Sequence, residues 1–188
     1  RLYPGRGSIV RAQRPQAQES WLDELAEREM GLVQQVITAV RSLRADLTVP
    51  FSQKLPVTLI APDEQTARLL ESQAEGIVWL GAASEFTVLG DGAKRPEDAL
   101  YLRAGDVEVY VHVNESVDVA RQAKRLRKKL DQVSSEIERS QRKLSSEEFL
   151  QRAPEAVVAK EREKLERAKE TARRLERHLQ VLERMLHE

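Results

Sequence analysis

The stretch that decides the fold is VARQAKRLRKKLDQVSSEIERSQRKL, residues 119–144, in which apolar residues recur at alternating steps of four and three. A second stretch with the same spacing runs from Val158 to Leu186. A repeat of 3.5 residues keeps one stripe of a helix facing a partner, and two such helices joined by a short turn most simply pair as an antiparallel hairpin. The sequence therefore predicts a coiled-coil arm at residues 116–188.

Each of the two apolar stripes is interrupted by one polar residue, Ser140 in the first and Glu161 in the second. At the tip, Ser145 and Glu148 have the spacing of a capping box, which predicts one helical turn over 146–150. Pro154 suits the start of the returning helix, expected over 154–187. The stripes consist of Val119, Ala123, Leu126, Leu130, Val133, Ile137 and Leu144, and of Val158, Leu165, Ala168, Ala172, Leu175, Leu179, Leu182 and Leu186.

The sequence of residues 1–115 predicts a small body of helices and strands that precedes the arm. An extended lead-in over 1–19 precedes a helix over 20–46, for which Ser20 is the expected cap and after which Pro50 prevents continuation. A strand over 55–60 then runs into a helix capped at Pro62-Asp63, with Gly76 placed to end that helix. Residues 77–80 fit either a strand or a helical turn.

Three further strands are expected over 86–89, 99–102 and 107–113, the last two joined as a hairpin. The predicted class is α+β: a small α/β module with a preceding helix, followed by a long antiparallel coiled-coil hairpin. The corresponding divisions are residues 1–50, 51–115 and 116–188.

Composition narrows the class of protein. The 188 residues include no cysteine, and 33% charged against 4% aromatic residues suits long solvated helices better than a deep enzyme pocket. The net charge of zero divides into about −5 for residues 1–116 and about +5 for 117–188. No apolar run approaches the roughly 20 residues that cross a bilayer, so we expect a cytoplasmic protein without a membrane partner.

Catalytic patterns are scarce. His178 and His187 are nine residues apart on one predicted helix, so they do not share a face as metal ligands four residues apart would, and His112 falls in a strand. No glycine-rich phosphate loop is present. We therefore expect no catalytic residue, no metal and no cofactor in these residues.

The distribution of Lys and Arg residues gives the clearest indication of function. The segment between Asp118 and Asp131 contains six Lys and Arg residues and no acid, which is the electrostatic pattern of a phosphate-binding surface. Cations beside a coiled-coil seam can instead pair with Glu, and we favour that interpretation for residues 160–177, where acids alternate with bases. Phe149 at the tip could stack on an RNA base or plug the end of the arm, and we favour the plug.

Two segments resemble the C-terminal part of bacterial valyl-tRNA synthetases. Residues 37–50, ITAVRSLRADLTVP, are similar to the end of the family's anticodon-binding helical domain, and residues 143–165, KLSSEEFLQRAPEAVVAKEREKL, to the tip and return of its coiled coil. The resemblance covers about residues 32–188. One departure is Ser-Ser-Glu-Glu-Phe at the tip, where the family more often has Ser-Asn before its Phe.

The resemblance implies a parent enzyme that ligates valine to its tRNA with ATP and removes mischarged threonine. The ATP-site signatures His-Ile-Gly-His and Lys-Met-Ser-Lys-Ser are absent here, so ATP would belong to the parent's catalytic domain. In the family the arm grips the outer corner of the tRNA. By position, the tRNA-binding candidates are Arg121, Lys124, Arg125, Lys128, Lys129, Arg139, Arg142, Lys143 and Phe149.

The sequence thus predicts a monomeric, non-catalytic docking portion whose partners are valine-specific tRNA and the remainder of the synthetase. The alternative is a stand-alone protein that dimerises or binds another protein through its coiled coil and does not bind RNA. An independent enzyme would require His112 and nearby carboxylates to form a buried site.

Overall fold

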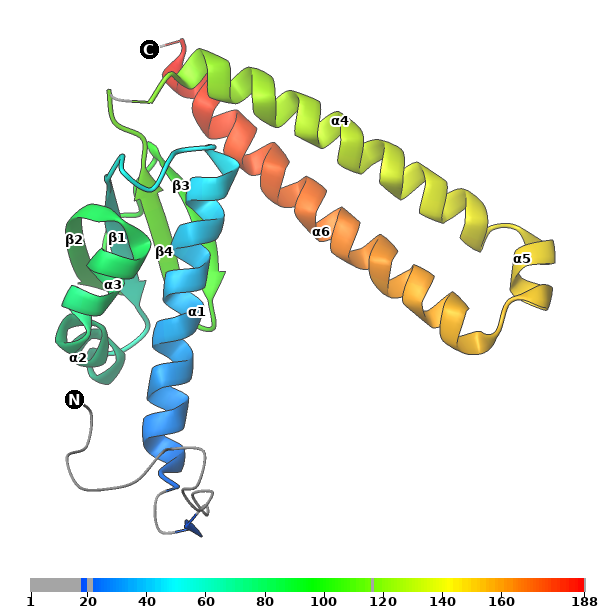
Figure 1. Cartoon of the computed structure of the whole chain (residues 1–188). Coiled ribbons are helices and arrows are strands. Elements are labelled where there is room, and N and C mark those ends of the chain that lie inside the picture. Colours follow the sequence, from blue (N-terminus) through cyan, green and yellow to red (C-terminus); the bar gives the residue numbers. More distant parts are fainter. Residues whose placement is uncertain (1–17, 20–21, 116, 188) are drawn as a thin grey trace, which may run out of the picture.

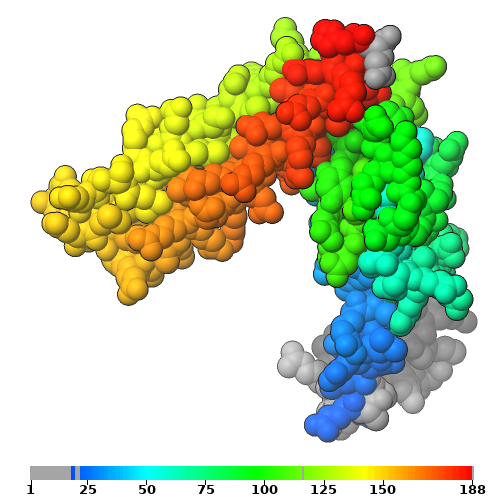
Figure 2. All heavy atoms as spheres, turned by 180° about the vertical axis from the view of Figure 1, so that it is seen from behind, coloured from blue at the N-terminus to red at the C-terminus, as the bar shows by residue number. Residues whose placement is uncertain are grey.

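The computed structural model describes residues 18–19, 22–115 and 117–187, and consists of a body and an arm that projects from it (Figure 1). The space-filling view shows the arm standing clear of the body along most of its length (Figure 2). This arrangement confirms the α+β class. The elements of the body are α1 (Glu24–Asp46), β1 (Leu55–Ala61), α2 (Glu64–Ser72), α3 (Ala74–Gly81), β2 (Ala83–Gly90), β3 (Ala99–Ala104) and β4 (Val107–His112). Those of the arm are α4 (Val119–Leu144), α5 (Glu147–Arg152) and α6 (Glu155–Met185).

The body is built on a four-stranded sheet in the order β2-β1-β4-β3. β1 and β2 are parallel and are connected through α2 and α3, whereas β4 is antiparallel to both β1 and β3. The predicted β3–β4 hairpin is confirmed, and Gly105 at its turn has φ of +59°, a left-handed conformation that suits glycine. The sheet is therefore mixed: a helical crossover joins its parallel pair, β1 and β2, and a tight hairpin joins β3 and β4.

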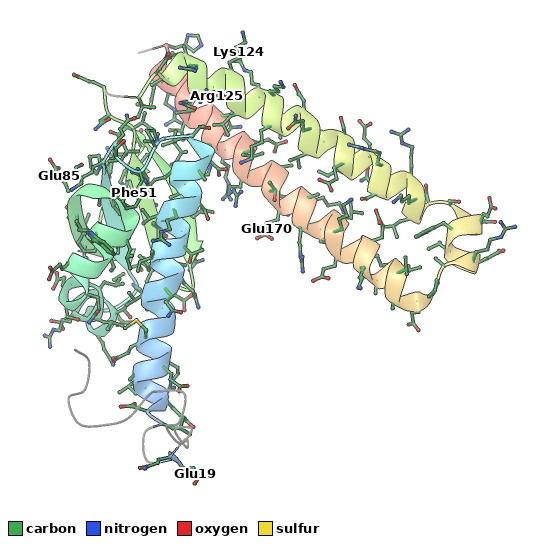
Figure 3. All side chains as sticks on the ribbon, in the orientation of Figure 1. Glu19, Phe51, Glu85, Lys124, Arg125 and Glu170 are labelled. Atoms are coloured by element: carbon green, nitrogen blue, oxygen red, sulfur yellow. The ribbon has the colours of Figure 1, made fainter. Side chains whose placement is uncertain are left out.

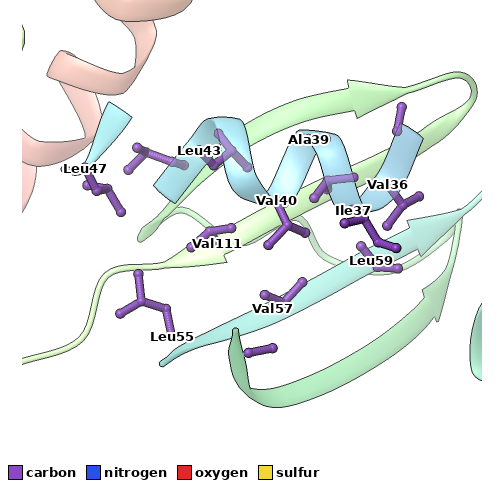
Figure 4. Close-up of a cluster of buried hydrophobic side chains, with 14 of the residues drawn as sticks. Val36, Ile37, Ala39, Val40, Leu43, Leu47, Leu55, Val57, Leu59 and Val111 are labelled. Carbon is purple, nitrogen blue, oxygen red and sulfur yellow. The ribbon is translucent and has the colours of Figure 1, made fainter. Parts of the chain in front are cut away.

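One face of the sheet carries the main core. Alternate strand residues such as Val57, Leu59 and Val111 face α1, whose Val40 and Leu43 are fully buried (Figure 4). Side chains of α2 and α3 join the same cluster, so the three helices form one layer over the sheet. Because strand side chains alternate in direction, the periodicity of two in residues 55–60 is accounted for by this layer.

The arm is the predicted antiparallel pair of helices, α4 against α6. Leu175 and Leu182 of its seam are fully buried, and the two polar interruptions meet: Ser140 Oγ donates a 2.8 Å hydrogen bond to Glu161 Oε1. Lys143 Nζ lies 3.7 Å from the other carboxylate oxygen of Glu161. Since a buried polar pair is satisfied in one register only, this contact specifies how the helices align.

The base of the arm shares its apolar core with the body. Leu43 and Leu47 at the end of α1 belong to the same buried cluster as Leu126 of α4 and Leu175 of α6. The arm is therefore packed against the body at its base and is solvated elsewhere (Figure 2).

A buried carboxylate lies at the same junction. Asp46, the last residue of α1, has a side chain only 2% exposed, and Lys129 Nζ of α4 donates to its Oδ1 at 2.7 Å. Arg174 Nε and His178 Nδ1 of α6 approach its Oδ2 at 3.2 and 3.3 Å, within ion-pair distance. His178 Nε2 is also 3.0 Å from the carbonyl oxygen of Tyr101 in β3. We call Asp46, Lys129, Arg174 and His178 the Asp46 cluster.

Several predicted boundaries were wrong. The cap of α1 is Asp23, whose carboxylate accepts from the backbone N–H groups of Leu25 and Ala26; Ser20 lies outside the described residues, as do residues 1–17 of the lead-in. Gly76 does not end a helix but lies inside α3, because α2 ends at Ser72 and the chain turns at Gln73. The ambiguous residues 77–80 are helical.

The tip differs from the prediction by one residue. Ser146 rather than Ser145 caps α5, with its Oγ accepting from the backbone N–H of Phe149 at 3.4 Å. Pro154 takes the cap position of α6, which ends at Met185. Ser116, the expected start of the arm, lies outside the described residues, and Asp118 caps α4 by accepting from the backbone N–H of Arg121.

A double-mutant cycle tests the polar contact in the seam. We expect Ser140→Ala to lower the free energy of unfolding by about 1 kcal/mol, because Glu161 loses its hydrogen-bond donor inside the seam. Adding Glu161→Leu should restore or exceed the original stability, since an apolar pair suits the seam. Urea denaturation measures both effects, and additive losses in the double variant would contradict this account.

Acid should weaken the Asp46 cluster. Burial would raise the pKa of the Asp46 carboxyl, but the contacts with His178 and Lys129 and the charge of Arg174 lower it below its ordinary value. A carboxyl with a lowered folded-state pKa stabilises the fold above its unfolded pKa of about 4, and this contribution is lost as the pH falls further. We expect the difference in melting temperature between the unmodified protein and Asp46→Asn to shrink between pH 5.5 and pH 3. A constant difference over that range would contradict the prediction.

Candidate nucleic-acid interface

Four of the predicted tRNA-binding residues share one exposed face at the start of α4. Arg121, Lys124, Arg125 and Lys128 are spaced by three and four residues, and positions so spaced lie on the same side of a helix. All four are exposed, whereas Ala123 and Leu126 between them are buried in the seam. We call this side of α4, including Arg139 and Arg142 further along, the outer face.

The cations at the start of the outer face are not neutralised by any described residue. Within the described part of the chain, the side chains of Arg121, Lys124, Arg125 and Lys128 have no hydrogen-bond or ion-pair partner. Figure 3 shows Lys124 and Arg125 where the arm leaves the body. These side chains are therefore available to an anionic partner.

The cations on the two flanks of α4 are used differently. Arg127 binds Glu183 of α6 at 2.5 Å, and Lys129 binds Asp46 of the body. Lys129 was predicted to bind tRNA, and that role stays a prediction, but its Nζ is already engaged in the Asp46 cluster. Acids of the described chain thus take the flanking cations and leave Arg121, Lys124, Arg125 and Lys128 free.

Toward the tip, the predicted residues make local contacts. Arg139 Nε donates to the carbonyl oxygen of Ser135 at 3.0 Å, and Arg142 lies 3.6 Å from Glu138. Lys143 leans toward Glu161 in the seam. Phe149 is half-buried on α5, so its ring is neither enclosed by the arm nor fully in solvent.

Five of the nine Lys and Arg side chains of α6 form ion pairs with described residues, and three of these pairs are with a Glu of the arm, as the alternation of acids and bases predicted. Lys164 binds Glu136 of α4 at 3.0 Å, and Lys169 binds Glu166 at 2.7 Å. Arg167 pairs with Glu163 one turn earlier. Lys160, Arg162 and Arg173 are exposed and have no partner among the described residues.

Among the described residues, His112 does not form the buried site with nearby carboxylates that an independent enzyme would require. His112 Nε2 is 2.9 Å from Thr58 Oγ1, and the neighbouring carboxylate of Asp98 is 66% exposed, so no buried acid–base pair exists at this strand. Among residues 18–19, 22–115 and 117–187, no group of three or more His, Asp or Glu side chains is placed to hold a metal ion. No helix in the same ranges has the length and apolarity to cross a membrane.

The residue that sequence reasoning missed is Asp46. It lies within the segment that resembles the end of the anticodon-binding domain, but a single acid at the end of a helix gives no sign that it will be buried. Its partners are 83 or more positions further along the chain. Only the packing of α4 and α6 on α1 brings them together.

The free and the engaged cations should differ in their effect on stability. We expect Lys124→Gln, Arg125→Gln and Lys128→Gln each to change the free energy of unfolding by less than about 0.5 kcal/mol, as surface substitutions do. Lys129→Met should cost about 2 kcal/mol, because it removes a charged hydrogen bond from a buried carboxylate. Urea denaturation of the four variants measures this, and a Lys129→Met variant as stable as the other three would contradict the assignment.

Comparison with known proteins agrees with this geometry. Residues 118–183, which span α4, α5 and most of α6, match the family model described as the valyl tRNA synthetase tRNA binding arm. The chain is 34% identical over 160 residues to a valine–tRNA ligase of Desulfotalea psychrophila, covering 85% of this chain and 18% of that protein. It is 37% identical over 158 residues to the one of Carboxydothermus hydrogenoformans, with 84% and 18% covered.

A valine–tRNA ligase of Geobacter sulfurreducens is 37% identical over 137 residues, which are 73% of this chain and 15% of the relative. The chain thus spans less than a fifth of the length of these curated relatives. The resemblance seen in the sequence is confirmed: the chain matches the C-terminal region of valyl-tRNA synthetases, and its projecting pair of helices matches the model of that family's tRNA binding arm.

Proposed function

We propose that this chain docks tRNA through the outer face of α4, as the non-catalytic C-terminal portion of a valyl-tRNA synthetase. The observation that carries the proposal is the set of unpaired, exposed cations on one side of an arm that matches a tRNA-binding family model. A phosphate backbone is the anionic partner that such a row of Lys and Arg suits.

The arm would hold the RNA by its shape and charge. Contacts to phosphate position a nucleic acid without reading its sequence, and Lys and Arg on a rigid helix supply such contacts at a regular spacing. The outer face has no acid between Asp118 and Asp131, so no like charge opposes the phosphates there. Sequence discrimination would lie elsewhere in the protein.

The proposal extends to the specificity of the tRNA, the location of the ligation reaction and the oligomeric state. We infer that the tRNA is the valine-specific one, that the ligation with ATP belongs to other parts of a longer enzyme in the cytoplasm, and that the chain acts as a monomer. The relatives' name, valine–tRNA ligase, supports the substrate. The closed seam supports the monomer: Ala123 and Leu175 are buried by the pairing of α4 with α6, so the stripe that would join two chains is occupied within one.

Salt dependence tests the electrostatic contact. If five or six phosphates are neutralised, the slope of log K against log salt concentration should be about −4 to −5. Filter binding or fluorescence anisotropy with tRNA between 50 and 300 mM salt measures the slope. Binding that is insensitive to salt would contradict a phosphate-docking role.

Charge reversal locates the contact. We expect the triple variant Lys124→Glu, Arg125→Glu and Lys128→Glu to weaken tRNA binding by about 100-fold or more, because like charges then face the phosphates. The salt slope should become shallower by about three. Since these side chains have no partner within the described chain, the melting temperature should stay close to that of the unmodified protein.

A matched control keeps the change in net charge equal. Lys54→Glu, Arg68→Glu and Lys94→Glu reverse three exposed cations of the body, away from the arm. This variant should bind tRNA with nearly unchanged affinity. Equal losses in the two triple variants would mean that only overall charge matters, and the outer face would not be the docking surface.

A further inference from the structure

The Asp46 cluster joins three separate parts of the molecule at one carboxylate. Asp46 ends α1 of the body, Lys129 lies on α4, and Arg174 and His178 lie on α6, with distances of 2.7, 3.2 and 3.3 Å to the carboxylate oxygens. His178 also contacts the carbonyl oxygen of Tyr101 in β3. Both helices of the arm therefore contact the same acid of the body.

We propose that Asp46 sets the direction in which the arm leaves the body, and that it thereby positions the outer face for RNA. The part concerning direction is independent of the ligand. The part concerning RNA rests on the proposed function.

The apolar contacts at the base of the arm hold it to the body through Leu43, Leu47 and Leu126, but the hydrophobic effect itself is not directional. A buried carboxylate is different, because any tilt that separates it from its partners leaves a charge without compensation. With partners on two helices, rotation about either helix axis breaks at least one contact.

The length of the arm magnifies small changes at its base. With 26 residues and a rise of 1.5 Å per residue, α4 is about 39 Å long, so a tilt of about 10° at the base moves the tip by about 7 Å. A displacement of that size exceeds the length of a hydrogen bond. Contacts near the tip, such as those predicted for Arg142 and Phe149, would be lost before those of Arg121 and Lys124 at the base.

Spin labels can measure the direction directly because the chain contains no cysteine. Labels at Glu71→Cys on α2 and Gln141→Cys on α4 report the distance from body to arm, and labels at Gln141→Cys and Glu170→Cys report a distance within the arm; all three positions are exposed. We expect a narrow body–arm distribution in the unmodified protein. Asp46→Asn should shift it by several ångströms or broaden it, with the distance within the arm unchanged. An unchanged body–arm distribution would overturn the proposal.

Two neighbouring lysine and arginine variants provide a second test that does not depend on the folding of Asp46→Asn. Lys129→Met removes a contact between arm and body, and Arg127→Met removes a contact between α4 and α6, each with the loss of one positive charge. The body–arm distance should change in the first variant only. The same distance distribution in both variants would overturn the proposal.

The part of the proposal that concerns RNA predicts a change in tRNA affinity opposite to the change that the altered net charge would cause. Asp46→Asn removes a negative charge, so charge alone would tighten tRNA binding, whereas a misdirected arm should weaken it by about tenfold or more. Glu136→Gln, which neutralises a partly exposed acid of the arm paired with Lys164, is the control and should bind tRNA as well as or better than the unmodified protein. Tighter binding by Asp46→Asn with an altered body–arm distance would overturn the RNA part alone. Absence of tRNA binding by the unmodified protein would instead refute the proposed function, while the distance measurement would still decide the role of Asp46.

Discussion

A charged carboxylate can be buried only if charged or polar partners replace the water it loses. Asp46 meets this requirement with Lys129, Arg174 and His178, which come from both helices of the arm. The fold of the arm and its attachment to the body are therefore coupled, because the partners of one carboxylate are assembled only when α1, α4 and α6 are all in place. The apolar cluster around Leu43 and Leu126 adds buried area to this junction.

Pairing with acids of the protein also divides the cations of the arm into two groups, the paired and the unpaired. Arg127 and Lys129, on the flanks of α4, reach acids of α6 and of α1, and Lys164, Arg167 and Lys169 of α6 reach a Glu within a turn or across the seam. Arg121, Lys124, Arg125 and Lys128 have no such partner among the described residues. A helix that is basic on several sides thus becomes, after pairing, basic on one side. That asymmetry gives the arm one face with the charge that the proposed phosphate contacts require, which the balanced charge of the whole chain conceals.

Polar residues also govern the alignment inside the arm. Ser140 and Glu161 would each weaken a seam of aliphatic side chains if they faced apolar partners, but they face one another. Leu175 and Leu182 would be buried in any register that keeps the apolar stripes together. The contact between Ser140 and Glu161 forms in one register only. Stability and specificity therefore come from different residues, in the arm as at its base.

The sequence alone determined the architecture and the family. The 3.5-residue repeat predicted α4 and α6, the alternation in residues 55–60 and 107–113 predicted the strands, and the segment around Phe149 carried the resemblance that the comparisons confirm. These features could be predicted from the sequence because helix periodicity, strand alternation and the residues of a motif all depend on positions close together in the chain. Boundaries at Ser20, Gly76 and Ser145 were misplaced, since several residues nearby can cap or end a helix equally well. Only the tertiary structure decided which cations are free and which are engaged, and that Asp46 is buried, because these properties depend on groups as far apart as Asp46 and Lys129 being brought within 2.7 Å.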